Sequence, residues 1–512
     1  MHTEIGRLNP KKATTFKNIP AKVLKSSSQI CSESLQLIFN DCVQNGLFPD
    51  LLKLADVTSL HKTEEKTRKK NYRPVSVLPT VSKVFERLLD KQIISYMGPY
   101  LSSLLCGFRK GYNAQHSLVR MLEKWKISLD NRENVGAILM DLSKAFDCIK
   151  HDLLLAKLDA YGFSREALRL VNSFLENRHQ RVKINGSFST YKQLSLGVPQ
   201  GSVLGPLFFN IYINDLLLSI QDTDICNYAD DTTIYACDNN LDNVIARLEN
   251  DSSIIIQWFA NNFMKLNTDK CHLLILGRNS NQHITVNVGD SVIENTEEEK
   301  LLGVVIDKRL TFETHISKLC KKAGNKLFAL ARISGYMDSN KLRILMRAFV
   351  ISQFQYCPLV WMFHSRHLNN KINRIHERAL RIAYKDYESS FNTLLGKDDS
   401  VSIHVKNLQT LLIEMFKTKE NINPPFMREI FCERTVTYNL RNNNEFLLPM
   451  VRTTSYGSET IKYRGQRLWL SLPQHIRNAQ SINEFKKEIK SWNGANCTCR
   501  LCRTFIPQLG FL

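Results

Sequence analysis

A short apolar run that stops at a carboxylate constrains this chain more than any other feature of its sequence. Residues 135–140 (VGAILM) are nearly all apolar, and the run ends abruptly at Asp141. A run of this length and composition is typical of a buried strand. An ionised carboxylate at the end of such a strand needs a partner or a metal ion, because burying an unpaired charge is costly. The pattern therefore indicates a functional site at the end of a core strand.

A second carboxylate site lies between two strand-like segments. Residues 225–228 and 232–235 read as short strands joined through Asp230 and Asp231. Phosphoryl transfer often uses two divalent ions about 3.5–4 Å apart, held by a few aspartates, and Mg²⁺ prefers such hard oxygen ligands. The two sites together are typical of a nucleotidyl-transfer centre. Taken alone, an Asp-Asp pair in a turn is more often ordinary turn chemistry.

The remaining pattern is mixed up to residue 306 and helical after it. Asn185 and Gly186 lie between strand-like runs within 181–191, which predicts a hairpin, and 61–73 reads as an exposed basic loop. Helices are expected at 32–42, 80–96, 153–160, 164–176, 207–218 and 243–261, and strands at 75–78, 272–276 and 301–306. From residue 400 onward the sequence is poorly periodic.

The charge balance favours a polyanionic partner. Lysine and arginine total 69 against 49 acidic residues, a formal charge of +20, which is most often a sign of nucleic-acid binding. Basic side chains recur every three or four residues along 371–385, although an ordinary solvated helix face would look the same. We find no apolar run long enough for a membrane span and no signal peptide in residues 1–9. Ten of the 13 cysteines are scattered singly, which favours a reducing, intracellular setting.

Seven segments in a fixed order identify a family resemblance. They are NYRPVSVLPTVSKVFERLL (71–89), CGFRKGYNAQHSL (106–118), ILMDLSKAFDCI (138–149), LGVPQGSVLGPLFFNIYINDL (196–216), CNYADDTTIY (226–235), LNTDKCHLLILG (266–277) and KLLGVVID (300–307). Their order and spacing resemble the reverse transcriptase of a jockey-like non-LTR retrotransposon. The resemblance covers about residues 10–385 well and continues more weakly to the C-terminus. Seven ordered motifs are far more specific than YADD alone.

The resemblance implies roles for the residues that match. Asp141 would be the first metal ligand, Asp230 would bind both of two Mg²⁺ ions (or Mn²⁺), and Asp231 would complete the set. Lys270 resembles the lysine proposed to protonate the leaving pyrophosphate, although a surface lysine would look the same. Residues 302–303 belong to the strand that resembles the primer grip.

Two further matches would contact the incoming nucleotide. Arg73 resembles the fingers arginine that grips the triphosphate, helped by Lys62 or Lys66, between which the sequence does not choose. Phe146, five residues past Asp141, resembles the steric gate beside the sugar 2′ position. Its alternative role is core packing.

The loop before the apolar helix supplies two more residues that match the family. Gln200 and Gly201 resemble the loop that touches the incoming nucleotide and the template, where glycine allows close backbone approach. A helix-entry turn is the alternative role for the glycine.

The last three cysteines are clustered as CTCRLC. Cys497, Cys499 and Cys502 supply three thiols, and the nearest upstream histidine is His475. The segment resembles the cysteine-rich nucleic-acid-binding ends of such elements. Zinc binding and reduced, unliganded cysteines both remain open.

The resemblance implies a right-hand polymerase. The α/β fingers and palm, with an antiparallel palm sheet, are expected at 56–306 after an N-terminal extension at 1–55. A helical thumb would follow at 307–390, and a mainly helical basic region at 391–512. The implied activity is RNA-directed DNA polymerisation, with an RNA template, a DNA primer or target and dNTPs as partners and no membrane. The implied location is the nucleus and cytoplasm, and the oligomeric state is open.

Alternatives from other classes remain. The chain could be an inactive remnant that only binds nucleic acid, although all three aspartates are intact. An RNA-dependent RNA polymerase usually carries an acidic residue where Phe146 stands, and a group II intron maturase would need Cys/His pairs that the tail lacks. The motifs contain no ribonuclease H cluster. Since the apurinic-type endonuclease common in such elements has no counterpart before residue 55, we expect no nicking of duplex DNA.

Overall fold

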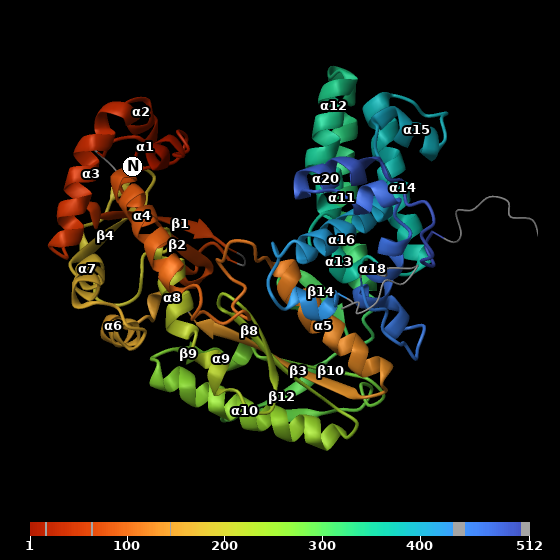
Figure 1. The fold of residues 1–512 in the computed structure, drawn as a ribbon, viewed down its shortest axis with the longest axis horizontal. Helices are drawn as coiled ribbons and strands as arrows, with labels where there is room; N and C mark the ends of the chain where they lie inside the picture. Colours follow the sequence, from red (N-terminus) through yellow and green to blue (C-terminus); the bar gives the residue numbers. More distant parts are fainter. Residues whose placement is uncertain (16–17, 63–64, 144, 434–445, 503–512) are drawn as a thin grey trace, which may run out of the picture. The chain divides into compact units, whose positions relative to one another are not determined.

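The computed structural model describes residues 1–512 except 16–17, 63–64, 144, 434–445 and 503–512, and it divides the chain into two compact units (Figure 1). Each unit is assembled from three segments of the chain. The first unit comprises Met1–Phe108, Asp141–Gln221 and Ser253–Asp269. The second unit comprises Arg109–Met140, Asp222–Ser252 and Lys270–Leu512.

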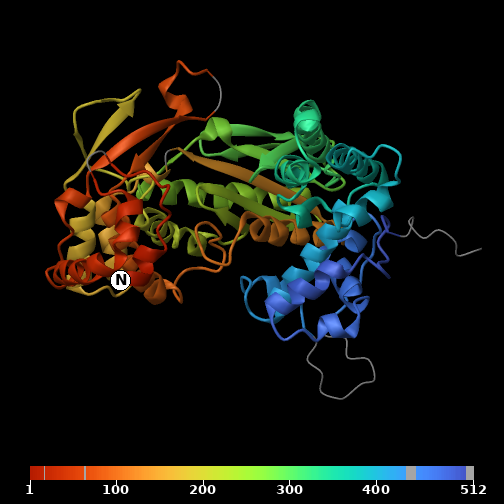
Figure 2. The same cartoon turned by 90° about the horizontal axis from the view of Figure 1, so that it is seen from above.

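The first unit packs helices on one side of a small sheet, as the red and yellow segments of Figure 2 show. β1 (Ala55–His61) pairs antiparallel with β2 (Tyr72–Val77) and parallel with β4 (Arg178–Ile184). The short strands β5 (Ser187–Phe188) and β6 (Lys192–Leu194) both pair with β4. The helices are α1 (His2–Gly6), α2 (Ala21–Ser26), α3 (Ser28–Gln44), α4 (Thr80–Met97), α6 (His151–Ala160), α7 (Arg165–Leu175), α8 (Leu204–Ile213) and α9 (Leu216–Ser219).

Aromatic packing joins three of these helices. Phe85 of α4 stacks on Phe39 of α3 with ring centroids 4.4 Å apart, and on Phe48 at 5.1 Å. Phe48 meets Phe174 of α7 edge-on, also at 5.1 Å. Buried aromatic pairs of this kind stabilise by both area and ring geometry. They therefore form the centre of the first unit's core.

A buried acid fixes the start of α8. The carboxylate of Glu86 accepts hydrogen bonds from the N–H groups of Val203 and Leu204, at 2.6 and 3.3 Å. Burial raises the pKa of Glu86, and the nearby Arg178 opposes that rise. Burial also lowers the pKa of Arg178 to about 10. Because Glu86 caps the free N–H groups of the first turn, the loop that leads into α8 is held in place.

The second unit is built on a larger sheet with the strand order β11-β12-β10-β3-β8-β7. Its strands are β3 (Asn134–Ser143), β7 (Asp224–Tyr228), β8 (Asp231–Asp238), β10 (His272–Leu276), β11 (Thr285–Val288) and β12 (Ser291–Thr296). α10 (Leu241–Asn261) packs against β3 at Gly136 (Figure 1). A Cβ at Gly136 would lie 2.6 Å from Val244 and 2.8 Å from Leu248, so only glycine allows this close packing.

Helices make up most of the rest of the second unit. They are α5 (Ala114–Asp130), α11 (Glu313–Ile333), α12 (Ser339–Leu345), α13 (Pro358–Trp361), α14 (Arg366–Tyr384), α15 (Phe391–Asp398), α16 (Ile403–Lys419), α17 (Met427–Ile430), α18 (Ile461–Leu470), α19 (Gln474–Arg477) and α20 (Ile482–Ser491). Buried carboxylates of α5 hold the distant C-terminal segment. Asp130 accepts a 2.6 Å hydrogen bond from the N–H of Thr453, and Glu123 accepts one of 2.9 Å from Ile461 at the start of α18.

Most of the expected elements are confirmed, including the hairpin at Asn185 and Gly186. The prediction of a single strand at 301–306 is wrong. These residues belong to a hairpin of β13 (Glu298–Leu301) and β14 (Val304–Asp307). The helix expected at 207–218 is interrupted at Asn214, between α8 and α9. The side-chain amide of Asn214 donates hydrogen bonds to the carbonyl of Tyr100 and to the hydroxyl of Tyr161. Within the described part of the chain, no helix is both long and apolar enough to cross a bilayer.

Candidate active site

The turn between β7 and β8 presents two of the three predicted carboxylates. Tyr228 pairs with Asp231 across the hairpin, so Ala229 and Asp230 form a two-residue turn. Ala229 has φ of 58°, in the left-handed region that costs a non-glycine residue about 1 kcal/mol or more. Both aspartates are half-buried. The hairpin therefore holds them on a tight, strained turn within the second unit.

The third carboxylate, Asp141, lies near the end of β3. Its backbone carbonyl accepts a 3.0 Å hydrogen bond from the N–H of Asn267, and the next residue, Leu142, pairs with Leu266 of β9 (Lys265–Leu266). The side chain of Asp141 is half-buried. In the sheet order, β3 is the neighbour of β8. Asp141 belongs to the first unit and the other two aspartates to the second, so their convergence on one site stays a prediction.

The loop before α8 packs tightly on the segment that follows Asp141. The N–H of Gly197 donates to the carbonyl of Ile149 at 2.8 Å, and the N–H of Val198 donates to that of Phe146 at 3.0 Å. A Cβ at Gly197 would lie 2.7 Å from the Phe146 carbonyl oxygen. Glycine is therefore required for this approach.

The same loop also contacts β2 through the two residues that the sequence singles out. The carbonyl of Gln200 accepts a 2.8 Å hydrogen bond from the N–H of Ser76. Gly201 has φ of 136°, and a Cβ there would lie 2.3 Å from the Ser76 carbonyl oxygen. The Gln200 side chain donates to Asp147 at 3.1 Å. Sequence reasoning missed Asp147, and its spacing from Asp141 carried no signal of this bond.

Phe146 lies half-buried in the short 3-10 helix Ala145–Asp147. Its ring stacks on Phe209 of α8, with centroids 4.7 Å apart, and meets Phe108 edge-on at 5.7 Å. Phe146 therefore has a packing role, which is the alternative to the steric gate that the sequence analysis names. Its role beside the sugar stays a prediction.

The predicted basic residues are solvent-facing. Arg73 is exposed on β2, where it pairs with Leu60 of β1. Lys62 and Lys66 are both exposed in the basic loop, so the choice between them stays open. Lys270 is exposed at the end of the short 3-10 helix Thr268–Lys270.

Sequence reasoning missed Tyr356 altogether. Its hydroxyl donates a 2.7 Å hydrogen bond to the carbonyl of Leu302, in the turn between β13 and β14. Burial, with smaller effects from Cys357 and then from Tyr228 and Asp231, raises the pKa of Tyr356 to about 12. Within the second unit, this tyrosine therefore joins the segment before α13 to the β13–β14 turn. No local sequence pattern marks it.

Residues 60–306 match the family described as reverse transcriptase (RNA-dependent DNA polymerase). This match and the relatives below confirm the predicted resemblance to jockey-like reverse transcriptases over this segment. This match and the mixed α/β architecture with a helical C-terminal region confirm the predicted fold class.

Several curated proteins are similar to this chain. The RNA-directed DNA polymerase from mobile element jockey of Drosophila melanogaster is 28% identical over 325 residues, covering 62% of this chain and 35% of that protein. The probable polymerase from transposon X-element of the same species is 28% identical over 379 residues, covering 71% and 41%. The jockey polymerase of Drosophila funebris is 27% identical over 393 residues, covering 74% and 42%. The chain thus spans less than half the length of these relatives.

The chain is also similar to a solved structure. Apo telomerase from Candida tropicalis, truncated from its C-terminal domain, aligns at 12% identity and a TM-score of 0.37, over 54% of this chain and 58% of that one.

Proposed function

We propose that this chain is an RNA-directed DNA polymerase of a non-LTR retrotransposon, which adds deoxynucleotides to a DNA 3′-OH primer on an RNA template. The observation that carries the proposal is the family match over residues 60–306, which includes every predicted site residue from Arg73 to Lys270. The intact carboxylates of Asp141, Asp230 and Asp231 favour this function over a remnant that only binds nucleic acid.

Asp141, Asp230 and Asp231 would hold two magnesium ions. Three half-buried carboxylates fit that metal, because Mg²⁺ prefers hard oxygen ligands and keeps part of its shell for water and phosphate. Metal ions bound there would stabilise the attacking 3′ oxygen and the leaving pyrophosphate oxygen. The intact motifs that contain these residues, in the order of the family, support the grouping of the three residues.

The first unit would bind the incoming nucleotide. Arg73, exposed on β2, would grip the triphosphate with its planar guanidinium. The backbone of Gln200 and Gly201 would lie under the nucleotide, and the bonds to Ser76 and Asp147 would hold that loop in one position. Such preorganisation of a binding loop favours the reactive geometry.

Two further residues would act on the sugar and the leaving group. Phe146 would exclude a 2′-hydroxyl by steric clash, and its stacking on Phe209 would keep the ring in place. Lys270 would donate a proton to the leaving pyrophosphate.

The helical region of the second unit would hold the primer-template. On α14, Lys371, Arg374 and Arg378 are exposed, whereas Ile372 and Ala379 on the other face are buried. A basic face of this kind suits the phosphates of a duplex, and binding through it weakens steeply with salt. The formal charge of +20 is consistent with this role.

Extension of a labelled DNA primer on an RNA template, with and without Mg²⁺, tests the proposal. The parent chain should extend the primer only with the metal, and Asp230→Asn should abolish extension without unfolding the protein. Asp159→Asn, which changes an exposed aspartate of α6, is the matched control and should extend normally. A parent that binds the primer-template but never extends it would favour the nucleic-acid-binding remnant.

A further inference from the structure

The structure brings a histidine into the C-terminal cysteine cluster. His404 is the second residue of α16, and its Nε2 lies 3.2 Å from the Sγ of Cys499. Ligand atoms of His404, Cys499 and Cys502 all lie within 4.8 Å of one another. His404 and Cys499 are only 5% and 3% exposed. This group lies entirely within the second unit.

The remaining thiol belongs to the same group. The thiol of Cys497 interacts with those of Cys499 and Cys502. Cys499 is buried and Cys497 and Cys502 are half-buried, so the group offers three sulfur atoms and one imidazole nitrogen as ligands.

We propose that His404, Cys497, Cys499 and Cys502 bind one zinc ion, which fastens the C-terminal cysteine segment to the start of α16. Three thiolates and one imidazole form a standard closed, tetrahedral structural site. With Zn–S near 2.3 Å and Zn–N near 2.0 Å, the ligand atoms of such a site lie about 3.5–3.8 Å apart. For His404, Cys499 and Cys502 the observed spacing needs only small side-chain movements to reach that geometry, and Cys497 would turn toward them to complete the set.

The surroundings favour a metal over free thiols. The backbone N–H of Cys502 donates to the Sγ of Cys499 at 3.4 Å, and a donor at sulfur stabilises the thiolate. None of the thirteen cysteines, all of which lie in the described part of the chain, forms a disulfide. His475, the nearest upstream histidine in the sequence, is exposed on α19. The fourth ligand is therefore not the one that sequence proximity suggests.

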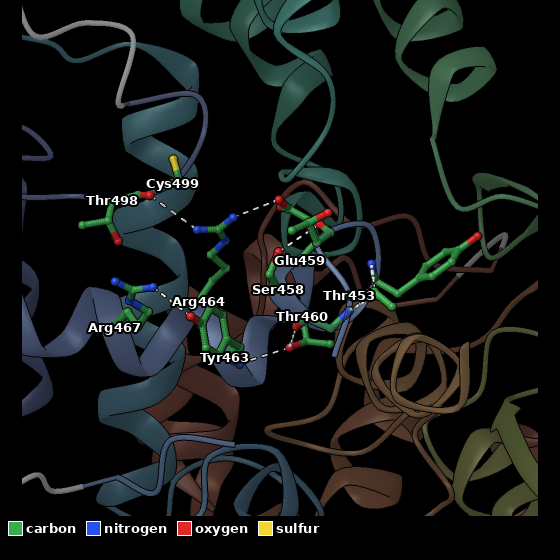
Figure 3. A network of polar contacts seen from close by, with 12 residues as sticks. Thr453, Ser458, Glu459, Thr460, Tyr463, Arg464, Arg467, Thr498 and Cys499 are labelled. Carbon is green, nitrogen blue, oxygen red and sulfur yellow. Dashed lines mark hydrogen bonds and ion pairs between the residues drawn. The ribbon is translucent and has the colours of Figure 1, made fainter. Parts of the chain in front are cut away.

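A second helix also holds the cysteine segment. Arg464 of α18 donates hydrogen bonds to the carbonyl of Thr498, at 3.5 Å, and to Glu459, at 2.9 Å (Figure 3). Thr498 lies between two of the proposed ligands. With zinc bound, the segment after α20 would be fixed to α16 by the metal and to α18 by Arg464. This structural role is separate from the polymerase activity proposed above.

Metal analysis of the full chain tests the proposal. Protein purified under reducing conditions should carry one zinc per chain by mass spectrometry of its metals. Replacement by Co²⁺ should give the intense visible bands and the thiolate charge-transfer band of a tetrahedral cobalt–sulfur site. His404→Asn and Cys499→Ser should each lower the zinc content to near zero. The matched controls, His475→Asn and Cys432→Ser, should keep one zinc.

Two further measurements keep the result decisive if those variants unfold. His404→Cys should retain the metal, with a cobalt spectrum shifted to that of four sulfur ligands. Chelation of zinc from the parent chain should increase hydrogen exchange in residues 497–502 and at the start of α16. A parent chain without zinc, or His404→Cys and His404→Asn proteins with the parent's cobalt spectrum, would overturn the proposal.

Discussion

The hydroxyl of Tyr356 donates a 2.7 Å hydrogen bond to the carbonyl of Leu302, in the two-residue turn that joins β13 to β14. Leu302 and Gly303 both have left-handed backbone angles, with φ of 46° and 83°. The Tyr356 ring lies beside this turn, since a Cβ at Gly303 would be 3.2 Å from it. Tyr356 therefore supports a strained turn for which the sequence predicts a primer-grip role.

Loss of this hydroxyl should weaken primer placement. Tyr356→Phe removes a hydrogen bond worth about 1 kcal/mol and keeps the ring, so the KM for primer-template should rise about fivefold with a smaller change in kcat. Tyr336→Phe, at a tyrosine that is 91% exposed, is the matched control. Steady-state extension at varied primer-template concentration measures both constants. Equal behaviour of the two variants would show that the bond to Leu302 has no part in primer binding.

The Phe146 ring should set the choice of sugar. Phe146→Val opens space beside the proposed sugar site, so the ratio of catalytic efficiencies for dGTP over GTP should fall by about tenfold or more. The variant should also lose some stability, because the stack on Phe209 is lost.

Phe209→Leu separates the two effects of the Phe146 change. It weakens the same stack but leaves the ring of Phe146 in the chain. This variant should lose stability and keep most of the sugar discrimination. If both variants keep the parent's ratio, Phe146 is a packing residue and the gate lies elsewhere.

Sequence reasoning predicted the elements that local patterns encode and missed those that depend on distant contacts. The apolar run before Asp141 and the Asn185-Gly186 turn specify a strand and a hairpin by themselves. The β13–β14 turn was missed because Leu302, which has no left-handed preference, occupies a left-handed position. His404 and Cys499 are 95 residues apart, and no periodicity relates them. The four-part domain division stays a prediction.

Gly201 should tolerate no side chain. Gly201→Ala would place a Cβ 2.3 Å from the Ser76 carbonyl oxygen at a φ that L residues rarely adopt, so the loop must move away from β2. We expect a loss of about 1–3 kcal/mol in the free energy of unfolding and a raised KM for dNTPs. The control is Gly186→Ala, which also has positive φ but no atom within 4 Å. A normal KM in Gly201→Ala would argue against a nucleotide-binding role for the loop.

Acidification should weaken the contact between α11 and β14 through His315. The Nδ1 of His315 accepts a 3.3 Å hydrogen bond from the N–H of Val305, so the folded ring is neutral. Burial, assisted by Lys322 and Lys318, lowers the pKa of His315 from 6.5 to about 4. As the pH falls from 6.5 toward 4, His315 takes up a proton in the unfolded chain before it does so in the folded protein. Stability from this residue is therefore complete above pH 6.5 and is lost progressively toward pH 4.

Urea unfolding at pH 7.5 and at pH 5.5 measures this effect. The parent should lose up to about 1.4 kcal/mol per pH unit from His315, with further losses from the buried His364 and His376, whose pKa values burial also lowers to about 4. His315→Asn offers an amide oxygen to the Val305 N–H in place of Nδ1 and cannot titrate, so its stability should fall less between the two pH values. His475→Asn, at an exposed histidine, should keep the parent's pH dependence. An equal loss in the parent and in His315→Asn would show that protonation of His315 does not limit stability in this range.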